Sequence, residues 1–379
     1  MAPRLRVLLD CRMATWTGVG RYTTGLARAL ARSEDVELIL VTAVGEEPPV
    51  VAGVGAADDA VTDIALQSVS ASKHPFSLAG ARELARIVRE VAPDVTHCAH
   101  FPTPLPARHP LVVTMHDLTP LVVPGIMPSA AKRAAYRWWN RRAVRVADRI
   151  ITDATFTVGE IERVFPQAAG RVTAIPLGVD DFACGSTGPL PESLRALAQT
   201  PYLLSMGSTR GHKDLPTLLS AFETIAPEYP ELQLLLVGAD EPGYLKRVLV
   251  SATPAVGARV AFTGRLDDGA LRTLMAGAMV FAFPSRYEGF GLPPLEAMAL
   301  GTPVVIAHAA SLPEVVGDGA LTFEPGDAVA LAAQLMALLD DADLRQRMSA
   351  AGRERASEFT WARAAAATIA VYREATSRS

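Results

Sequence analysis

The sequence has few cysteines and no long apolar run. Its three cysteines, Cys11, Cys98 and Cys184, show no CxxC spacing, and their odd number disfavours both a disulfide framework and a structural zinc site. A reducing, cytoplasmic environment therefore fits best. Residues 1–12 lack the long apolar segment of a signal peptide, and no uncharged stretch of about 18 residues occurs later. We expect a soluble protein that at most lies on the surface of a membrane.

An excess of charge of one sign is also missing. The 36 basic and 40 acidic residues give a formal net charge of -4, so bulk charge provides no reason to expect a nucleic-acid partner. Half of the residues are hydrophobic and 20% are charged, which excludes a disordered or fibrous chain. The length of 379 residues exceeds the usual size of one domain, roughly 100 to 150 residues, so we expect two domains.

Short apolar runs rich in β-branched residues alternate with longer helical patterns along the chain. The runs that we predict as strands include 6–10, 36–42, 111–115, 149–152, 202–206, 232–237, 260–262, 280–283 and 303–306. This alternation is typical of βαβ units. It predicts an α/β protein with parallel sheets, helices on both faces of each sheet and ligands at the carboxyl ends of the strands.

A stretch of Gly, Ser, Thr and Pro at 183–191 separates two such sets of strands and is typical of a linker. We therefore divide the chain into a first domain over residues 1–180, a second domain over 181–358 and a C-terminal helix over 359–379. That helix is rich in alanine, and its aromatic residues suit packing on either domain.

The most informative segment is FPSRYEGFGLPPLEAMALGTPVVI at 283–306. It predicts a buried strand, a loop with Gly289 and Gly291, and a helix that begins at Pro293, where the missing N–H of proline has no consequence. Gly301 ends that helix before the next strand. The loop therefore leads onto a helix N-terminus at the carboxyl end of a strand. There, backbone N–H groups and the helix dipole favour an anion such as phosphate.

Two carboxylates, Glu288 in this loop and Glu296 in this helix, flank the predicted anion site. An anion repels carboxylates, so we expect them to bind hydroxyl groups, because a carboxylate accepts hydrogen bonds from a vicinal diol such as that of a ribose. Phosphate between two sets of hydroxyls describes a nucleotide sugar. The alternative is that Glu288 is a solvated loop charge and Glu296 a surface residue of the helix.

These motifs, E-x7-E followed by AMALGTPVV and preceded by FPSRYEGFGLPP, resemble the signature of the retaining glycosyltransferases of family 4. The resemblance spans nearly the whole chain in the order of the family. Its further stretches are GVGRYTTGLARAL (18–30), PDVTHCAHF (93–101), VVTMHDLTPLVVP (112–124), IPLGVD (175–180), LLSMGSTRGHKDLPTLLSAF (203–222), LLLVGAD (234–240), VAFTGRLDDGALRTLMAGA (260–278) and SLPEVVGDGAL (311–321). It implies the GT-B architecture, in which two Rossmann-like domains with parallel sheets face each other across a cleft and a C-terminal helix crosses back to the first domain.

The resemblance also implies roles for residues of the second domain. Glu288 would face the transferred sugar, and Glu296 would bind the ribose hydroxyls. Lys213 and Arg210 would neutralise the diphosphate, whose charge grows as the sugar leaves, although Arg210 has a solvated loop position as its alternative. The remaining donor contacts would come from two loops. The loop beside the diphosphate would contribute Gly289, Phe290, Gly291 and Leu292. The loop beside the nucleobase would contribute Arg265 and Leu266.

In the first domain, the resemblance places Gly18 and Gly20, in a loop after the first strand, over the donor diphosphate, because glycine leaves room for the sugar. This loop lacks the full GxGxxG pattern and gives little support to a nicotinamide dehydrogenase. His116 would lie beside the donor sugar, with Asp117 fixing its tautomer or its loop; a His–Asp pair that only caps the loop is the alternative. The acceptor side would hold Tyr22, His100 and Asp117.

The histidines near Asp117 do not form a metal-binding pattern. No HxH or HxxxH spacing occurs on a single predicted element. The resemblance implies a donor site in which Lys and Arg supply the positive charge in place of a metal. We therefore expect no metal and no cofactor, with the nucleotide diphosphate sugar as co-substrate.

A row of arginines at steps of four residues is not required by this donor site: Arg133, Arg137, Arg141, Arg145 and Arg149. The spacing puts them along one slowly drifting stripe of a helix, with aromatic residues nearby. Such a stripe suits an anionic membrane or a lipid pyrophosphate, and a solvated helix face is the common alternative.

The sequence therefore predicts transfer of a hexose from a nucleotide diphosphate sugar to a glycan, lipid-linked or small-molecule acceptor, with the retention that the resemblance implies. The motifs DCRMATWTGVGRYT and MHDLTPLVVP resemble those of mannosyltransferases, so GDP-mannose is the expected donor. Two alternatives stay open. One is a nucleotide-sugar hydrolase or epimerase on the same architecture, and the other is a nucleotide-sugar-binding protein without catalysis.

Overall fold

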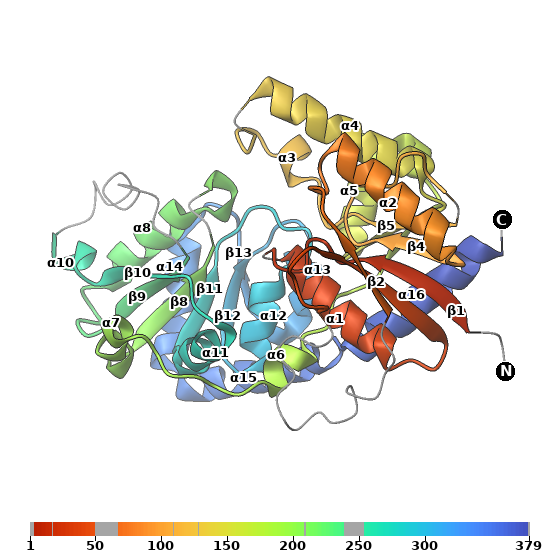
Figure 1. Ribbon diagram of the computed structural model, residues 1–379. Helices are drawn as coiled ribbons and strands as arrows, with labels where there is room; N and C mark the ends of the chain where they lie inside the picture. Colours follow the sequence, from red (N-terminus) through yellow and green to blue (C-terminus); the bar gives the residue numbers. More distant parts are fainter. Residues whose placement is uncertain are drawn as a thin grey trace. The chain divides into compact units, whose positions relative to one another are not determined.

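Two parallel β-sheets form the framework of the computed structural model (Figure 1). The structure describes residues 4–16, 18–49, 67–108, 110–127, 129–207, 210–238 and 254–377. Among the motif residues interpreted above, Thr17, Ser208, Thr209, Ala239 and Asp240 lie outside these ranges. The chain divides into two compact units: the first comprises Met1–Val122, Met127–Gly178 and Thr360–Ser379, and the second comprises Val123–Ile126 and Val179–Phe359.

The first unit contains a seven-stranded sheet of order β3-β2-β1-β4-β5-β6-β7, in which all neighbouring strands are parallel. Helices cover both faces of this sheet (Figure 1). Its elements are β1 (Leu5–Asp10), α1 (Val19–Ala31), β2 (Val36–Ala43), β3 (Gln67–Ala71), α2 (Leu78–Val91), β4 (Val95–Cys98), β5 (Leu111–Thr114), α3 (Thr119–Val122), α4 (Ala130–Val146), β6 (Arg149–Thr152), α5 (Thr155–Val164), β7 (Val172–Ala174) and α16 (Trp361–Thr376).

The second unit contains a six-stranded parallel sheet of order β10-β9-β8-β11-β12-β13. A 3₁₀ turn at Gly211–Lys213 follows its central strand β8. Its other elements are α6 (Asp180–Cys184), α7 (Glu192–Arg195), β8 (Tyr202–Met206), α8 (Leu215–Ile225), β9 (Gln233–Val237), α10 (Pro254–Gly257), β10 (Val260–Gly264), α11 (Asp268–Gly277), β11 (Val280–Phe283), α12 (Leu292–Ala299), β12 (Val304–Ala307), α13 (Leu312–Val316), β13 (Leu321–Phe323), α14 (Ala328–Asp340) and α15 (Ala342–Ser357).

The predicted α/β class with two Rossmann-like sheets is confirmed. Each predicted strand coincides with an observed one, since strands buried on both faces are continuous apolar runs. The strands outside the predicted set are β3, β4, β7 and β13. Three of these, β3, β7 and β13, are edge strands, which are short or polar because one side lacks a neighbour.

The core of each unit lies between its sheet and the covering helices. In the first unit, Leu8, Leu84 and Ile150 are fully buried in one apolar cluster, and Leu203 and Phe222 are fully buried in the corresponding cluster of the second. Burial of one such side chain contributes about 1.5 to 3 kcal/mol, so these clusters fix the strands whose ends carry the loops described below.

The C-terminal helix α16 belongs to the first unit, as the resemblance implies. Its Trp361 packs against α1 at Gly25, where an added Cβ would collide with the indole ring. Tyr372, about three turns further along α16, is fully buried and shares a hydrogen bond of 2.6 Å with Nδ1 of His97 in β4. Packing against Trp361 therefore leaves no room for a side chain at Gly25, and no ligand is needed to explain this glycine.

Candidate functional site

The order of the strands in the second sheet reverses between β8 and β11. In open parallel sheets of this kind, ligands bind outside the carboxyl ends of the strands at the point where the order reverses. Residues 210–214 follow the first of these strands, and the loop 284–291 follows the second. They carry Lys213 and Glu288, two of the predicted site residues.

The structure brings Lys213 and Glu288 together. The ammonium Nζ of Lys213 lies 2.5 Å from Oε1 of Glu288, and the two side chains are 18% and 16% exposed. The same ammonium lies 5.3 Å from the centroid of the Phe283 ring at the end of β11. The alternative of a solvated loop charge therefore does not hold for Glu288. A half-buried cation is available at this edge of the sheet, held by a carboxylate and an aromatic face.

Backbone contacts join the two loops as well. The amide of Arg286 and the hydroxyl of Ser285 both donate to the carbonyl oxygen of His212, at 2.7 and 3.2 Å. Burial and the neighbouring Lys213 cation together lower the pKa of His212 to about 4. His212 is therefore neutral near pH 7, and the positive charge of its loop comes from Lys213 and Arg210.

A second ion pair at this edge, between Arg286 and Asp214, was not predicted. Arg286 Nε lies 2.7 Å from Oδ2 of Asp214, which also accepts a hydrogen bond of 2.8 Å from the Thr217 hydroxyl. Asp214 begins α8 in the left-handed region, with φ at 47°. Arg286 lies within the FPSRYEGFG motif. The motif therefore indicated this loop, but it did not indicate that Arg286 pairs with Asp214.

The predicted anion-binding helix begins where the sequence places it. α12 spans Leu292–Ala299, has proline in its first turn and has no side-chain cap. Gly291 before it adopts φ 111°, and an added Cβ would lie 2.6 Å from Leu312 Cδ2, so both conformation and space require glycine. The buried hydroxyl of Ser311 donates to the carbonyl oxygens of Glu288 and Phe290, at 3.0 and 2.8 Å. The loop is thus held in place by its own unit.

Glu296 lies on the inner side of α12 and is only 2% exposed. The alternative of a surface residue of the helix therefore does not hold. A carboxylate this deeply buried requires polar partners, because burial of an uncompensated charge is costly. Glu296 follows Gly291 by five residues, so it lies just after the first turn of α12.

The other predicted donor residues occupy the same edge of the second sheet. Arg210 is exposed and precedes the turn that carries Lys213, to whose amide its carbonyl oxygen is hydrogen-bonded at 2.9 Å. Arg265 is exposed and Leu266 is half-buried in the loop between β10 and α11. These positions agree with ligand contact and with solvation alike, so the donor roles of Arg210, Arg265 and Leu266 stay predictions.

In the first sheet the order reverses between β1 and β4. The predicted glycine loop follows β1 and opens α1 at Val19. Gly18 has φ 66°, and a Cβ added at Gly20 would collide with the carbonyl of Ala14. Local conformation and packing thus require both glycines, and their contact with a diphosphate stays a prediction.

The imidazole of His116 is bound on both sides. Nδ1 lies 2.8 Å from Oδ2 of Asp153, and Nε2 lies 3.1 Å from the carbonyl oxygen of Ala99. Burial opposes the charged form, but the Asp153 carboxylate outweighs it, so the pKa of His116 is raised. Both partners are acceptors, so both ring nitrogens donate and His116 carries a proton on each. The carboxylate at its ring is thus that of Asp153, and Asp117 fixes the loop by accepting from the Thr119 amide at 2.8 Å.

A chain of buried polar groups lies next to His116. The Tyr22 hydroxyl and the Thr114 hydroxyl share a hydrogen bond of 2.7 Å, and Thr114 is 2.8 Å from Nε2 of His97. The other nitrogen of His97 bonds Tyr372 in α16. Burial lowers the pKa of His97 to about 3 and raises the pKa of Tyr22, so both groups are neutral. Tyr22 is 4% exposed, and its predicted contact with an acceptor is not tested by this arrangement.

His100 follows β4 and packs between aromatic rings, with centroids 4.1 Å from Phe101 and 5.8 Å from Phe76. Burial lowers its pKa well below the ordinary value. Within the described ranges, no group of three or more His, Cys, Asp or Glu side chains is arranged to hold a metal ion. The predicted place of His100 on the acceptor side stays a prediction.

One member of the predicted arginine stripe was placed wrongly. Arg149 begins strand β6, is 5% exposed and forms an ion pair of 3.1 Å with Glu374 of α16. A step of four residues continues a stripe only while the helix lasts, and α4 ends at Val146. The exposed members of the stripe are therefore Arg133, Arg137, Arg141 and Arg145.

Another finding concerns the length and hydropathy of the helices. None of the helices in the part of the chain that the structure describes is both long enough and apolar enough to span a membrane.

Comparisons with known proteins agree with the two units. Residues 190–355 match the family described as Glycosyl transferases group 1, and residues 16–181 match Glycosyltransferase Family 4. The chain is 28% identical to the O-antigen chain mannosyltransferase B of Escherichia coli over 94% of this chain and 96% of that protein. It is 33% identical to the MMP alpha-(1->4)-mannosyltransferase of Mycolicibacterium hassiacum over 71% of this chain and 66% of that protein.

Solved structures share the fold. The sucrose-phosphate synthase of Thermosynechococcus elongatus superposes with a TM-score of 0.74 at 21% identity, and the alignment covers 99% of this chain and 100% of that one. An Anabaena protein solved in complex with UDP and glucose superposes with a TM-score of 0.69 at 20% identity over 97% of this chain and 100% of that one. The chain belongs to the group 1 and family 4 glycosyltransferases and is a transferase enzyme with the GT-B fold.

Proposed function

We propose that this glycosyltransferase moves mannose from GDP-mannose to a hydroxyl acceptor, with retention at the anomeric carbon. The observation that carries the donor assignment is the pairing of Lys213 with Glu288 at the reversal point of the second sheet, beside the N-terminus of α12. A cation and a helix N-terminus suit a diphosphate, and nearby carboxylates suit sugar hydroxyls. Mannose is supported by the two mannosyltransferase relatives.

In this proposal the bond between the anomeric carbon and the diphosphate oxygen breaks, the acceptor oxygen forms the new bond on the same face of the sugar, and the proton of the acceptor hydroxyl passes to the leaving diphosphate. Lys213 stabilises the charge that develops on the leaving diphosphate, with Arg210 as the second cation. The backbone N–H groups from Gly289 to Leu292 hold the same group. Glu288 binds hydroxyls of the transferred sugar, and Glu296 binds those of the ribose.

Binding of the diphosphate requires Lys213 to change partners. Its ammonium lies 2.5 Å from Glu288, so a phosphate oxygen must share or replace that contact. The released carboxylate can then accept from a sugar hydroxyl. In the first unit, a hydroxyl that accepts from Nε2 of His116 replaces the carbonyl of Ala99. The exchange at Lys213 makes recognition of the sugar by Glu288 depend on binding of the diphosphate.

The proposal includes no metal and no cofactor, because the cations of the loops provide the positive charge that the diphosphate needs. It also places the enzyme in the cytoplasm, in agreement with three free cysteines, and at the membrane through the exposed arginines of α4. Turnover is expected to be unchanged by EDTA. A loss of turnover that Mg²⁺ restores would contradict the metal-free mechanism.

The test is a turnover assay with GDP-mannose, UDP-glucose and ADP-glucose, each with a panel of lipid-linked and small glycosides. GDP-mannose is expected to give a glycoside product whose anomeric configuration, read by NMR, matches that of the donor. Release of GDP without an acceptor product would favour the hydrolase alternative. Binding of GDP-mannose without any turnover would favour a non-catalytic protein.

A further inference from the structure

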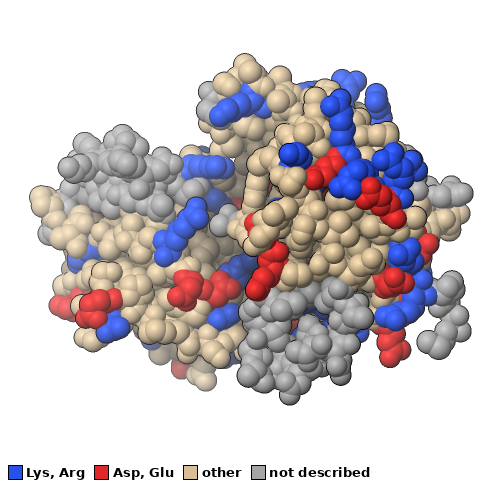
Figure 2. Space-filling model, viewed as in Figure 1, with Lys and Arg blue, Asp and Glu red and all other residues tan. Residues whose placement is uncertain are grey.

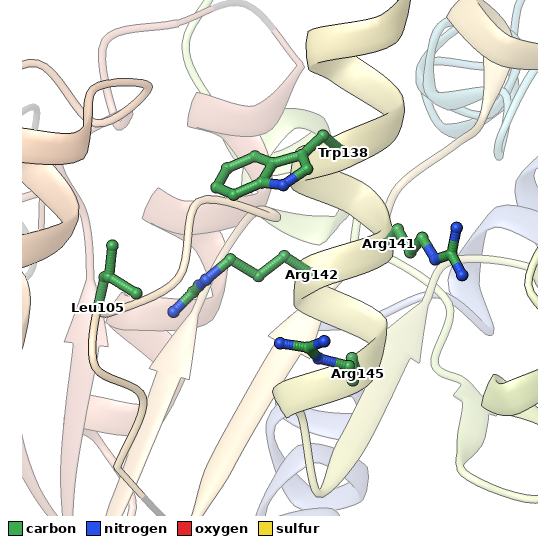
Figure 3. A pocket seen from close by; sticks show the side chains of 5 residues that line it. All are labelled: Leu105, Trp138, Arg141, Arg142 and Arg145. Carbon is green, nitrogen blue, oxygen red and sulfur yellow. The ribbon is translucent and has the colours of Figure 1, made fainter.

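The first unit contains a cavity that the donor site does not use. It has a volume of about 430 Å³ and lies between α4 and the segment around Leu105 (Figure 3). That volume falls within the range of small-molecule sites, roughly 300 to 1,000 Å³. Its lining residues are Leu105, Trp138, Arg141, Arg142 and Arg145.

The side chains that form this cavity come mainly from one face of α4. Trp138, Arg142 and Arg145 project from the helix toward Leu105, whereas Arg141 leaves the helix on another side (Figure 3). Trp138, Arg142 and Arg145 are separated by steps of four and three residues, so they share one face of the helix. The cavity lining therefore combines three arginine side chains, of which Arg142 and Arg145 point toward Leu105, with an indole and an aliphatic side chain.

The guanidinium of Arg142 is held in place without a carboxylate. The side chain is 9% exposed, and Nη1 donates to the carbonyl oxygen of Thr103 at 3.3 Å; further bonds run to the Thr103 hydroxyl and the Pro104 carbonyl. Burial lowers the pKa of Arg142, and the Arg145 cation lowers it further. Two cations thus face one space.

No acidic residue offsets this charge within the helix. The 17 residues of α4 include Lys132 and five arginines but no Asp or Glu. Among the described residues, no carboxylate forms an ion pair with Arg141, Arg142 or Arg145. Figure 2 shows Lys and Arg side chains along the upper edge of the first unit, where Figure 1 draws α4. An anion in the cavity would relieve the repulsion between the guanidinium groups.

The apolar part of the cavity indicates what carries the anion. Trp138 is 49% exposed, an unusual state for the largest apolar side chain, and its ring packs edge to face on buried Trp139 with centroids 4.9 Å apart. Trp138 and Leu105 form an apolar wall beside the guanidinium groups. Inorganic phosphate would leave this wall exposed to water, whereas an amphiphile would cover it.

We propose that this cavity binds a phosphate or diphosphate ester carried on an apolar chain. The guanidinium groups of Arg142 and Arg145 bind the phosphate oxygens, and Trp138 and Leu105 cover the first carbons of the chain. The site lies within the first unit, so the proposal does not depend on the donor assignment. The ligand would be lipid-like, and its site would be distinct from that of the nucleotide sugar.

The test is isothermal titration calorimetry of the full-length protein without any nucleotide sugar. Farnesyl diphosphate, inorganic diphosphate and farnesol are titrated separately. Farnesyl diphosphate is expected to bind more tightly than either part alone. The Arg145→Ala variant is expected to weaken its binding by about tenfold, as for the loss of a charged hydrogen-bonding partner. Trp138→Ala is expected to weaken farnesyl diphosphate binding and to leave inorganic diphosphate binding unchanged.

The matched control is Arg137→Ala, which removes the same charge from an exposed position of the same helix outside the cavity lining. It is expected to leave farnesyl diphosphate binding unchanged. Equal losses in Arg137→Ala and Arg145→Ala would show a general charge effect of the stripe and overturn the cavity proposal. Equal affinity for inorganic diphosphate and farnesyl diphosphate would overturn its apolar part, and binding of farnesol as tight as farnesyl diphosphate would overturn its anionic part.

Discussion

At the reversal point of the second sheet, Lys213 and Glu288 keep 18% and 16% of their side chains exposed. At the reversal point of the first sheet, His97 is fully buried and Tyr22 is 4% exposed. The two sheets share a parallel Rossmann-like order, and both place loops at the same kind of position. The second sheet uses that position for charge that can reach a ligand, whereas the first uses it largely for neutral hydrogen bonds that hold α16.

This difference separates two kinds of polar residue that look alike in a sequence. Lys213 and Glu288 have each other as partners, and an anionic ligand can compete for that contact. His97 bonds Thr114 and Tyr372 in the interior, where no ligand is needed to explain it. Substitutions should therefore impair turnover in the second unit and stability in the first.

The largest expected effect is that of Lys213→Ala. Loss of one cation that stabilises developing charge should lower kcat by about 10²- to 10³-fold, as for loss of one oxyanion donor. The exposed Lys73→Ala is the control, and it should leave kcat unchanged. Stopped assays with the preferred donor measure both. Equal rates for Lys213→Ala and the wild type would show that Lys213 does not act on the donor.

A smaller effect on stability is expected for Gly25→Ala in the first unit. The added Cβ collides with Trp361, so the docking of α16 should lose about 1 to 3 kcal/mol, as for other overpacked sites. All four tryptophans lie in the first unit, so their fluorescence in urea reports its unfolding. Gly159→Ala is the control, because an added Cβ there meets nothing within 4 Å. An unchanged midpoint for Gly25→Ala would show that α16 does not dock as described.

Tyr372→Phe should have a similar or slightly smaller effect. It removes one partner of buried His97, which costs about 1 to 3 kcal/mol in a fully buried site. Tyr229→Phe removes a hydrogen bond of 2.7 Å to Asp340 near the surface and should cost less. The donor KM should be unchanged in both variants. A raised donor KM for Tyr372→Phe, with stability unchanged, would show instead that these buried hydrogen-bonded groups take part in donor binding.

A more gradual effect, spread over several pH units, is a pair of opposite pH dependences. The folded state lowers the pKa of His97 from 6.5 to about 3, so its stabilisation is complete above pH 6.5 and falls as the pH drops toward 3. The folded state raises the pKa of His116 above 6.5, so its stabilisation is complete below 6.5 and is lost as the pH rises through the folded value. In each case the free energy of unfolding changes by at most about 1.4 kcal/mol per pH unit.

Urea titrations of His97→Gln and His116→Gln at several pH values measure these slopes. The first variant should lose part of the acid-side slope, and the second should lose part of the slope above pH 6.5. Slopes identical to that of the wild type would contradict the protonation states assigned to the two histidines.

The sequence predicted most of the fold because strands buried on both faces, such as β8 and β11, are continuous apolar runs. It also predicted the loop before α12, since Gly291 and Pro293 have specific backbone roles. It did not predict the Asp153 partner of His116, because 37 residues separate them and only the pairing of β5 with β6 brings them together. For the same reason Arg149 was assigned to a stripe, although the strand β6 directs it to Glu374.

The most direct test of the account is hydrogen exchange of the full-length protein with and without GDP-mannose, in the wild type and in Lys213→Ala. The account predicts that GDP-mannose protects peptides that cover residues 210–216 and 284–296, and that Lys213→Ala loses this protection whereas Lys73→Ala keeps it. Saturating binding of GDP-mannose without protection of these two loops would contradict the assignment of the donor site to the reversal point of the second sheet.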